Sequence, residues 1–290
     1  MAEGPRINLA WGRMRMKAIV FLGGGHITGA LAAGLRLAGY RGEIVVYDRH
    51  PEKVRALRRE SQVKMARDLK SALERTGISR AGSSRAGMLV IAVGPGSVEE
   101  TLHEVVACGA TAPGLCVSLA AGIPLRNLRR WLGPPVRWAR AMPSPVCRIA
   151  RGLTPVSFDR SVAESERARV RKLFGYVGPV LDLPERQLDA ITAAHSPTHG
   201  YHALATLARA AEGAGLDRAT ALTAAAHALS DGILYWRETG KELSELLREA
   251  ATPGGIAAAT MAAMDASGYA RVVRNGIRAG VRQARLNARR

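Results

Sequence analysis

Three consecutive glycines, Gly23, Gly24 and Gly25, constrain the fold of this chain more than any other feature of its sequence. They follow an apolar run at 17–22 that contains β-branched residues, as a buried parallel strand does. They precede a stretch at 27–37 whose apolar residues recur at helical spacing. Glycine permits a tight turn and a close approach to a pyrophosphate, and the helix N-terminus offers free N–H groups to its oxygens. The segment therefore predicts a dinucleotide-binding βα unit.

An acidic residue ends the next predicted strand, at 43–47. Asp48 lies about 20 residues beyond the glycine turn, where a carboxylate accepts hydrogen bonds from the ribose hydroxyls of NAD and would repel the 2′-phosphate of NADP. Arg49 follows and could instead pair with that phosphate, and His50 offers a further contact. With Pro51, the same segment could also be only a helix-capping turn. We therefore expect NADH or NADPH as the cofactor, with NAD favoured.

Strands and helices alternate as far as Pro184, and the sequence beyond it is rich in Ala and Leu and helical in pattern. Alternation of this kind is typical of a parallel sheet with helices on both faces. We predict an α/β Rossmann-type domain with a parallel sheet over 17–184, an all-α domain over 185–290, and a disordered extension at 1–16. Further strands are expected at 88–93, 115–119, 153–157 and 180–183, and further helices at 51–59, 97–107, 125–131 and 163–174.

Charge and composition limit the classes of partner. The chain has 290 residues, of which 47% are hydrophobic, and this is enough for two ordinary domains. No apolar run reaches the roughly 18–20 residues of a membrane-spanning helix. The net charge of +18 comes mostly from Arg spread along the chain, without a known nucleic-acid module and with only 4% aromatic residues. We expect an anionic cofactor and a small-molecule substrate, and neither nucleic acid nor a membrane as partner.

The cysteines give no sign of a disulfide scaffold or a metal site. There are three, Cys108, Cys116 and Cys147, and none forms a close pair such as CxxC. This usage fits a reducing, cytoplasmic setting.

Several segments, in order along the chain from residue 16, resemble those of pyrroline-5-carboxylate reductases. Several motifs in the same order and at compatible spacing identify a family far more specifically than a glycine turn alone does. The matching segments are the opening at 16–31, Asp-Arg-His-Pro-Glu-Lys at 48–53, Ile-Ala-Val-Gly-Pro at 91–95, Val-Ser-Leu-Ala-Ala-Gly-Ile-Pro at 117–124, Arg-Ala-Met-Pro at 140–143, Asp-Ala-Ile-Thr at 189–192 and Thr-Pro-Gly-Gly at 252–255.

The resemblance implies a Rossmann domain followed by an all-α domain through which two chains interlock, with assembly of dimers into larger oligomers also open. It implies reduction of the cyclic imine 1-pyrroline-5-carboxylate to L-proline by NADH or NADPH. The imine nitrogen must be protonated or hydrogen-bonded to become electrophilic, and backbone N–H groups near the Pro-Gly-Gly turn hold the substrate carboxylate. The protein then mainly supplies orientation and electrostatics.

Together, the glycine turn and the resemblance predict which residues form the site. The cofactor residues are Gly23, Gly25, His26, Ile27, Asp48, Arg49, Ala92, Val93, Pro95, Ala120, Ala121, Met142 and Pro143. The substrate residues are Thr192, Thr198, Thr252, Gly254 and Gly255, and Tyr201 is a catalytic candidate. No metal ligands are expected.

The sequence departs from the family pattern around the expected substrate. The usual Asn-Thr-Pro after Met-Pro is Ser-Pro-Val at 144–146, and the usual Lys at the end of the 91–95 motif is Gly94. At 195–201 only the final Tyr of the family segment survives. The Thr that closes Pro-Gly-Gly-x-Thr, an expected hydrogen-bond partner of the imine, is Ala257.

These departures suggest a changed substrate or a replacement proton donor. His195 and His199 are the candidate donors, because a histidine with a pKa of about 6.5 can protonate a developing amine at neutral pH. Alternatively, both histidines only pack or cap at the helical interface. We expect an imine reductase with pyrroline-5-carboxylate as the default substrate. The alternatives are a reductase of a different imine or carbonyl and, because of Ala257, a non-catalytic dinucleotide-binding protein.

Overall fold

The computed structural model describes residues 18–76, 87–108 and 114–289, which form two compact units. The first unit takes the described chain as far as Ile191 and also contains residues 284–289. The second unit is Thr192–Gln283. The extension expected at 1–16 lies outside the described residues.

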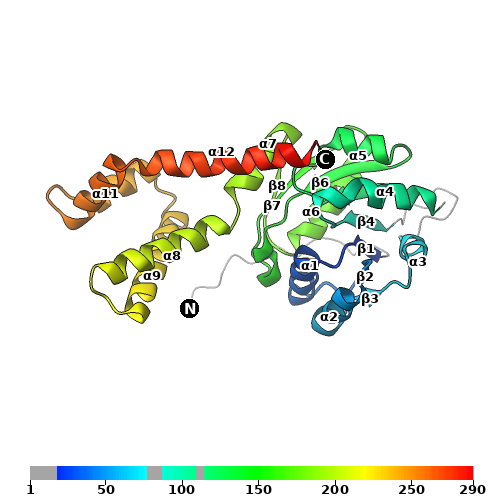
Figure 1. Cartoon of the computed structure of the whole chain (residues 1–290), viewed down its shortest axis with the longest axis horizontal. Helices are drawn as coiled ribbons and strands as arrows, with labels where there is room; N and C mark the ends of the chain where they lie inside the picture. Colours follow the sequence, from blue (N-terminus) through cyan, green and yellow to red (C-terminus); the bar gives the residue numbers. More distant parts are fainter. Residues whose placement is uncertain (1–17, 77–86, 109–113, 290) are drawn as a thin grey trace. The chain divides into compact units, whose positions relative to one another are not determined.

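The first unit is built on an eight-stranded sheet with the order β3-β2-β1-β4-β5-β6-β7-β8 (Figure 1). Neighbouring strands from β3 to β6 are parallel, and this 3-2-1-4-5-6 order is that of a doubly wound dinucleotide-binding fold, so the predicted Rossmann-type fold is confirmed. The strands are β1 (Ala18–Leu22), β2 (Glu43–Tyr47), β3 (Lys64–Met65), β4 (Met88–Ile91), β5 (Leu115–Ser118), β6 (Arg137–Ala141), β7 (Thr154–Phe158) and β8 (Val180–Asp182).

The predicted parallel sheet is confirmed in its main part, and its far edge contains an antiparallel pair. β7 runs antiparallel to β6, and β8 is parallel to β7. The connection from β6 to β7 contains only a short 3₁₀ helix, η2 (Pro145–Ile149), instead of the crossover helix that usually joins parallel strands. The sequence reading also missed β6, because arginines occupy two of its five positions, Arg137 and Arg140.

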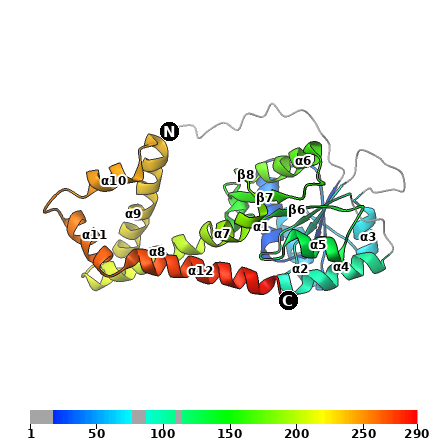
Figure 2. The same ribbon diagram turned by 90° about the horizontal axis from the view of Figure 1, so that it is seen from above.

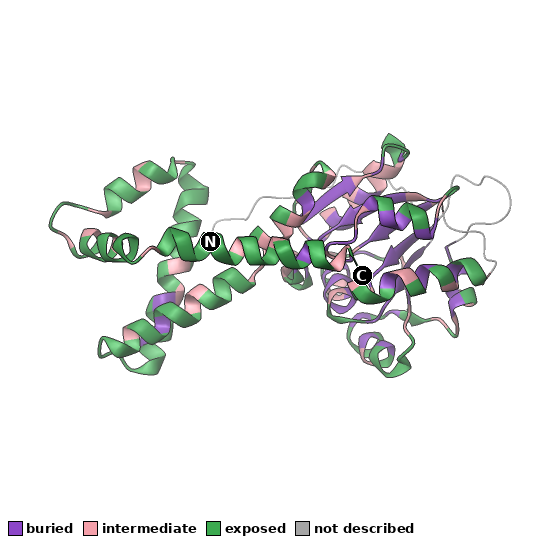
Figure 3. Ribbon diagram, turned by 45° about the horizontal axis from the view of Figure 1, so that its top comes forward, coloured by how far each residue is buried: buried purple, intermediate pink, exposed green. Residues whose placement is uncertain are grey.

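Helices cover both faces of the sheet, as expected. Alternate residues of β1 divide between two cores, with Ile19 and Phe21 in one and Val20 and Leu22 in the other. Figure 3 shows the buried strands between exposed helix surfaces. The first core is closed by α1 (His26–Leu37), α2 (Pro51–Ser61) and α6 (Glu164–Gly175), and the second by α3 (Leu69–Glu74), α4 (Val98–Ala107) and α5 (Leu125–Trp131).

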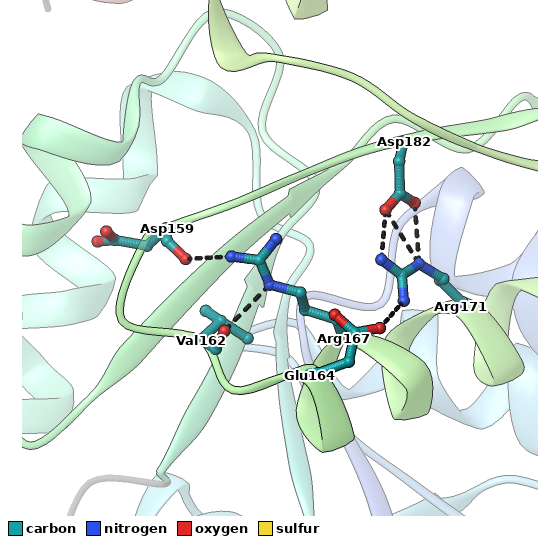
Figure 4. A network of polar contacts seen from close by, with 6 residues as sticks. All are labelled: Asp159, Val162, Glu164, Arg167, Arg171 and Asp182. Atoms are coloured by element: carbon teal, nitrogen blue, oxygen red, sulfur yellow. Dashed lines mark hydrogen bonds and ion pairs between the residues drawn. The ribbon is translucent and has the colours of Figure 1, made fainter.

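Polar contacts attach the edge strand β8 to α6 (Figure 4). Arg171 pairs with Asp182 at 2.6 Å and also with Glu164. Arg167 donates from Nε to the carbonyl oxygen of Val162 at 3.0 Å. Exposed ion pairs contribute little stability individually, so the pair between Arg171 and Asp182 mainly fixes the position of β8. The contact from Arg167 holds the loop before α6.

The second unit is helical and buries few of its side chains within one chain (Figures 2 and 3). Ile233, Leu234, Tyr235 and Trp236 are consecutive in α9, so they point to all sides of the helix, yet each is 40–57% exposed. A helix that is apolar all round is normally enclosed by other protein. The helices of the unit are α8 (Thr198–Gly213), α9 (Arg218–Thr239), α10 (Leu243–Ala250) and α11 (Ile256–Ala266), with parts of α7 (Glu185–Ala194) and α12 (Tyr269–Asn287).

The division between the two units falls inside α7. The boundary predicted from the sequence, residue 184, coincides with the change from strands to helices. The first turns of α7 belong with the sheet because Leu188 is fully buried and Glu185 accepts a 2.6 Å hydrogen bond from the N–H of Leu125. Arg140, only 2% exposed, forms ion pairs with Glu185 at 3.3 Å and with Asp189 at 3.4 Å.

The end of α12 also belongs to the first unit. Asn127 donates from Nδ2 to the carbonyl oxygen of Ala288 at 3.0 Å, and Asn287 donates to that of Ala121 at 3.3 Å. Gly122 lies so close to Ala284 that a Cβ on the glycine would overlap its carbonyl group.

Candidate active site

The predicted cofactor residues lie at one edge of the sheet, in the segments that follow the strands and in the first turns of α1 and of the 3₁₀ helix η1 (Pro95–Ser97). The parallel register places Leu22 opposite Tyr47 and Ile91, Ile91 opposite Ser118, and Ser118 opposite Arg140. The segments that follow β1, β2, β4, β5 and β6 therefore leave the sheet side by side. β1 and β4 flank the switch point of the strand order, where open α/β sheets bind ligands beyond the carboxyl ends of their strands.

Gly23 brings the turn after β1 against the segment after β4. Its φ is 110°, and a Cβ here would lie 2.7 Å from the carbonyl carbon and oxygen of Ala92. Its N–H donates to the carbonyl oxygen of Tyr47 at 2.8 Å. Only glycine fits this position without strain.

Gly25 provides an open approach to the N-terminus of α1. It is exposed, and a Cβ on it would meet no atom within 4 Å. It precedes His26 as the N-cap residue, and no side chain caps the helix. The first-turn N–H groups of α1, which have no partner inside the helix, therefore suit the oxygens of a pyrophosphate.

Thr28 stands where the dinucleotide fingerprint usually has its third glycine. It is fully buried, and its hydroxyl donates a 2.6 Å hydrogen bond to the carbonyl oxygen of Gly23. The close packing of α1 depends instead on Gly29, where a Cβ would lie 2.8 Å from Leu57, and on Gly34, where it would overlap the carbonyl oxygen of Cys147.

Asp48 fixes the turn after β1 and the turn before α2. Its Oδ2 accepts from the N–H of Gly24 at 2.6 Å, and its Oδ1 accepts from the N–H of His50 at 2.8 Å. His50 is the N-cap residue of α2, and no side chain caps that helix. A carboxylate has about four acceptor sites, so two remain for ribose hydroxyls. Holding the two turns and binding a ribose are therefore compatible in one side chain.

Arg49 is turned towards α4. Its Nη1 lies 2.9 Å from Glu100 Oε2, and its Nη2 lies 2.7 Å from Glu104 Oε1. The hydrogen bond that Arg49 donates to Glu100, with the charge of both glutamates, raises the pKa of the Arg49 guanidinium. Sequence reasoning missed these glutamates, although two acids four residues apart at the start of a helix after β4 were a usable signal.

Burial makes Cys147 unsuitable as a nucleophile near Met142 and Pro143. It is fully buried, and desolvation raises the pKa of its thiol to about 12. No group of three or more His, Cys, Asp or Glu side chains suited to a metal ion occurs in the described residues. None of the helices in that part of the chain has the length and apolar character needed to cross a membrane.

The predicted substrate and catalytic residues lie in the second unit, at two places in its sequence. Thr192, His195, Thr198, His199 and Tyr201 lie around the junction of α7 and α8. His199 contacts the carbonyl oxygen of Ala193 through Nε2 at 2.8 Å, so this nitrogen carries a proton and caps the end of α7. Tyr201 is 66% exposed, and the hydroxyl of Thr198 accepts from Ser196 at 3.0 Å.

The second place is the turn before α11, which contains Thr252, Gly254 and Gly255. Gly254 has a φ of 77°, and Gly255 is the N-cap residue of α11 and donates to the carbonyl oxygen of Thr252 at 2.9 Å. A Cβ on Gly255 would lie 2.7 Å from the hydroxyl of Thr252. The turn therefore depends on both glycines.

The strand order, the glycine turn at the switch point and the carboxylate after β2 define the first unit as a dinucleotide-binding domain of the Rossmann type. Comparison with known proteins agrees: residues 18–122 match the family model described as NADP oxidoreductase coenzyme F420-dependent, and residues 185–286 match that of pyrroline-5-carboxylate reductase dimerisation. The chain belongs to the pyrroline-5-carboxylate reductase family, as its ordered motifs predicted.

Individual relatives match over nearly the whole chain. The pyrroline-5-carboxylate reductase of Corynebacterium melassecola is 30% identical, over 87% of this chain and 92% of its own. That of Mycobacterium tuberculosis is 31% identical, over 91% and 94%. The crystal structure of Plasmodium falciparum pyrroline carboxylate reductase with NADP bound has the same fold, with a TM-score of 0.81 at 17% identity over 95% of this chain and 99% of that one.

Proposed function

We propose that this chain reduces 1-pyrroline-5-carboxylate to L-proline with NADH or NADPH. The observation that carries the proposal is the assembled cofactor edge: Gly23, whose missing Cβ admits the Ala92 segment, the uncapped start of α1 after Gly25, and Asp48 beside them. These features fit a dinucleotide, with the pyrophosphate at the N-terminus of α1 and the adenosine ribose at Asp48. A bound reduced nicotinamide supplies the hydride.

The remaining cofactor contacts are assigned to the segments after β4, β5 and β6. Ala92, Val93 and Pro95 follow β4, and Ala120 and Ala121 follow β5. Met142 and Pro143, after β6, are buried. These residues supply mainly backbone and apolar contacts, so their task is to orient the cofactor and exclude water.

We assign substrate binding to the second unit. First-turn N–H groups of α11, which starts at Ile256 after Gly254 and Gly255, are suited to a carboxylate. Thr192, Thr198 and Thr252 are proposed as polar contacts, and Tyr201 as a catalytic group. The exposure of Thr198, Tyr201 and Thr252 in a single chain fits a site that a second copy completes.

A histidine is proposed to supply the proton that Thr would direct in other family members. His199 already uses its Nε2–H on the carbonyl oxygen of Ala193, so a proton for the imine would come from Nδ1 of its protonated ring. This capping contact favours a packing role for His199, and His195 stays a candidate beside it. Loss of turnover with retained cofactor binding in either His195→Ala or His199→Ala would identify the donor, and unchanged turnover in both variants would refute the proposal.

We propose a homodimer held by the second unit, because the dimerisation model spans 185–286 and the apolar ring at 233–236 is uncovered in one chain. The three free cysteines fit the reducing environment of the cytoplasm, where we place the enzyme. We expect small molecules, not nucleic acids or membranes, as its other partners.

The test has two stages. Binding of NADH and NADPH is measured first by the fluorescence of the reduced nicotinamide, and then its oxidation is followed with 1-pyrroline-5-carboxylate. Binding with turnover supports the proposal. Binding without turnover would favour a different imine or carbonyl substrate, for which Ala257 is the motivating observation, or a non-catalytic protein. Turnover with other cyclic imines then separates these two, and absence of dinucleotide binding would refute all three.

A further inference from the structure

Arg49 is held between two carboxylates of α4. We name Arg49, Glu100 and Glu104 the Arg49 cluster. Each terminal nitrogen of the guanidinium faces a different glutamate, at 2.9 Å and 2.7 Å. Glu100 and Glu104 are four residues apart, so they project from the same face of α4. The cluster bridges the loop after β2 and the helix after β4.

This cluster lies next to the residue that meets the adenosine ribose in the proposed function. Asp48 directly precedes Arg49, and both of its oxygens are fixed by the N–H groups of Gly24 and His50. Glu100 and Glu104 also line a hollow of about 510 Å³ together with Pro95, one of the proposed cofactor residues. Because both glutamates contact Arg49, which directly follows Asp48, they lie beside the proposed ribose position.

The charges of this surface distinguish the two cofactors. Asp48, Arg49, Glu100 and Glu104 together carry three negative charges and one positive charge. The 2′-phosphate of NADPH adds about two negative charges at neutral pH, whereas the 2′-hydroxyl of NADH adds none. A phosphate at this cluster meets a net negative charge, and the guanidinium of Arg49 is already paired with both glutamates.

Arg49 could serve the 2′-phosphate only by leaving both glutamates. It would then give up two charge-assisted hydrogen bonds and leave Glu100 and Glu104 without the cation that neutralises them, beside the added phosphate. Each exposed ion pair is weak by itself. However, the loss of both contacts and the two unneutralised glutamates all make the binding of NADPH less favourable.

We propose that Glu100 and Glu104 withhold Arg49 from the ribose 2′ position and so make the enzyme prefer NADH to NADPH. The inference rests on the proposed function, because it assumes that the ribose binds at Asp48. It concerns cofactor binding alone, so it is tested without any substrate.

The experiment compares dissociation constants of NADH and NADPH for the full chain. For the wild type we expect NADH to bind at least about tenfold more tightly, a difference of about 1.4 kcal/mol. In the double variant Glu100→Gln/Glu104→Gln, Arg49 is released. The Kd for NADPH should then fall about tenfold, and the Kd for NADH should stay within about twofold of the wild-type value. Adding Arg49→Ala to the double variant should abolish this increase in NADPH affinity.

Glu99→Gln is the matched control. Glu99 lies on the same helix and lines the same hollow, and its substitution removes one negative charge, as each substitution of the double variant does. Among the described residues Glu99 forms neither of the ion pairs of Arg49. We expect it to leave the NADH to NADPH ratio within about twofold, because charges further from the phosphate are screened by solvent and salt.

The proposal would be overturned if the wild type bound NADPH as tightly as NADH or more tightly, or if the ratio of the two dissociation constants were unchanged in the double variant. It would also be overturned if Glu99→Gln increased NADPH affinity as much as the double variant does, or if that increase persisted when Arg49→Ala was added. Failure of both cofactors to bind would instead refute the proposed function. Binding of both without turnover would leave the measured ratio as a valid test.

Discussion

The N–H of Gly24 donates a 2.6 Å hydrogen bond to the Oδ2 atom of Asp48, which joins the turn after β1 to the end of β2. The second oxygen of the same carboxylate holds the N–H of His50. One side chain thus fixes the shape of the glycine turn and the start of the loop that carries Arg49. In the proposed function, cofactor affinity and local stability therefore depend on the same residue.

Asp48→Asn tests this double dependence. An asparagine can accept only one of the two N–H hydrogen bonds, because its amide nitrogen is a donor, so the N–H of either Gly24 or His50 loses its partner. We expect the free energy of unfolding to fall by about 1–3 kcal/mol and the Kd for NADH to rise at least about tenfold. Urea denaturation and fluorescence titration measure the two effects. Glu52→Gln, an exposed neighbour, should change neither; unaltered stability in Asp48→Asn would show that Asp48 does not hold the two turns.

Gly23→Ala should destabilise the first unit. A Cβ would lie 2.7 Å from the Ala92 carbonyl group, and φ is 110°. We expect a loss of about 1–3 kcal/mol, visible as a lower midpoint of thermal unfolding without cofactor. Gly25→Ala is the control, because a Cβ there meets nothing within 4 Å. It should keep the unfolding midpoint, and equal losses in both variants would show that the Ala92 contact is not the cause.

Thr28→Val should weaken the attachment of α1 to the turn. The substitution keeps the shape of the buried side chain but removes the hydroxyl that donates to Gly23 at 2.6 Å, and it leaves that carbonyl oxygen without this donor. We expect a cost of about 1–3 kcal/mol in urea denaturation. Thr28→Ser retains the donor and should cost less than Thr28→Val. The reverse order would indicate that packing, not the hydrogen bond, fixes the helix.

Asp68 should make stability depend on pH at the acidic end. Hydrogen bonds from the backbone and side chain of Ser71, and then from Arg67, lower the pKa of Asp68 from 3.8 to about 2. Because the pKa is lower in the folded state, the carboxylate stabilises the fold above pH 3.8, and this contribution is lost as pH falls towards 2. Wild type and Asp68→Asn should therefore differ in unfolding midpoint at neutral pH and converge at low pH; a constant difference would contradict the assignment.

Leu234→Asp should prevent self-association. Leu234 is 57% exposed in one chain and belongs to the apolar ring of α9 that we expect a second copy to enclose. Burying an unpaired carboxylate there is unfavourable. Sedimentation velocity over a concentration series should show a shift from dimer to monomer. Leu37→Asp is the control, because Leu37 is 67% exposed on the first unit; equal behaviour of the two variants would weaken the case for the ring as an interface.

The features that sequence alone predicted are those that depend on residues close together in the sequence. The glycine turn, the acid after β2 and most strands have local signatures of spacing and residue type, and the structure has them where they were expected. The register of parallel strands then brings distant loops to one edge.

The features that were missed depend on partners far apart in the sequence. The strand β6 carries a buried Arg140 because Glu185 and Asp189, 45 and 49 residues away, accept from it. Arg49 faces glutamates 51 and 55 residues away, so its orientation has no local signal. The substrate side could be predicted least, because its side chains are mostly exposed in a single chain.

The return of residues 284–289 to the first unit has a genetic consequence. The helical unit is an insertion anchored at both ends, through α7 and through the last turn of α12. A stop codon at position 284 would leave the sequence of that unit intact but remove Asn287 and Ala288 from their contacts with Ala121 and Asn127. After the loss of these seven residues, the helical unit would be connected to the first unit at its N-terminal end only.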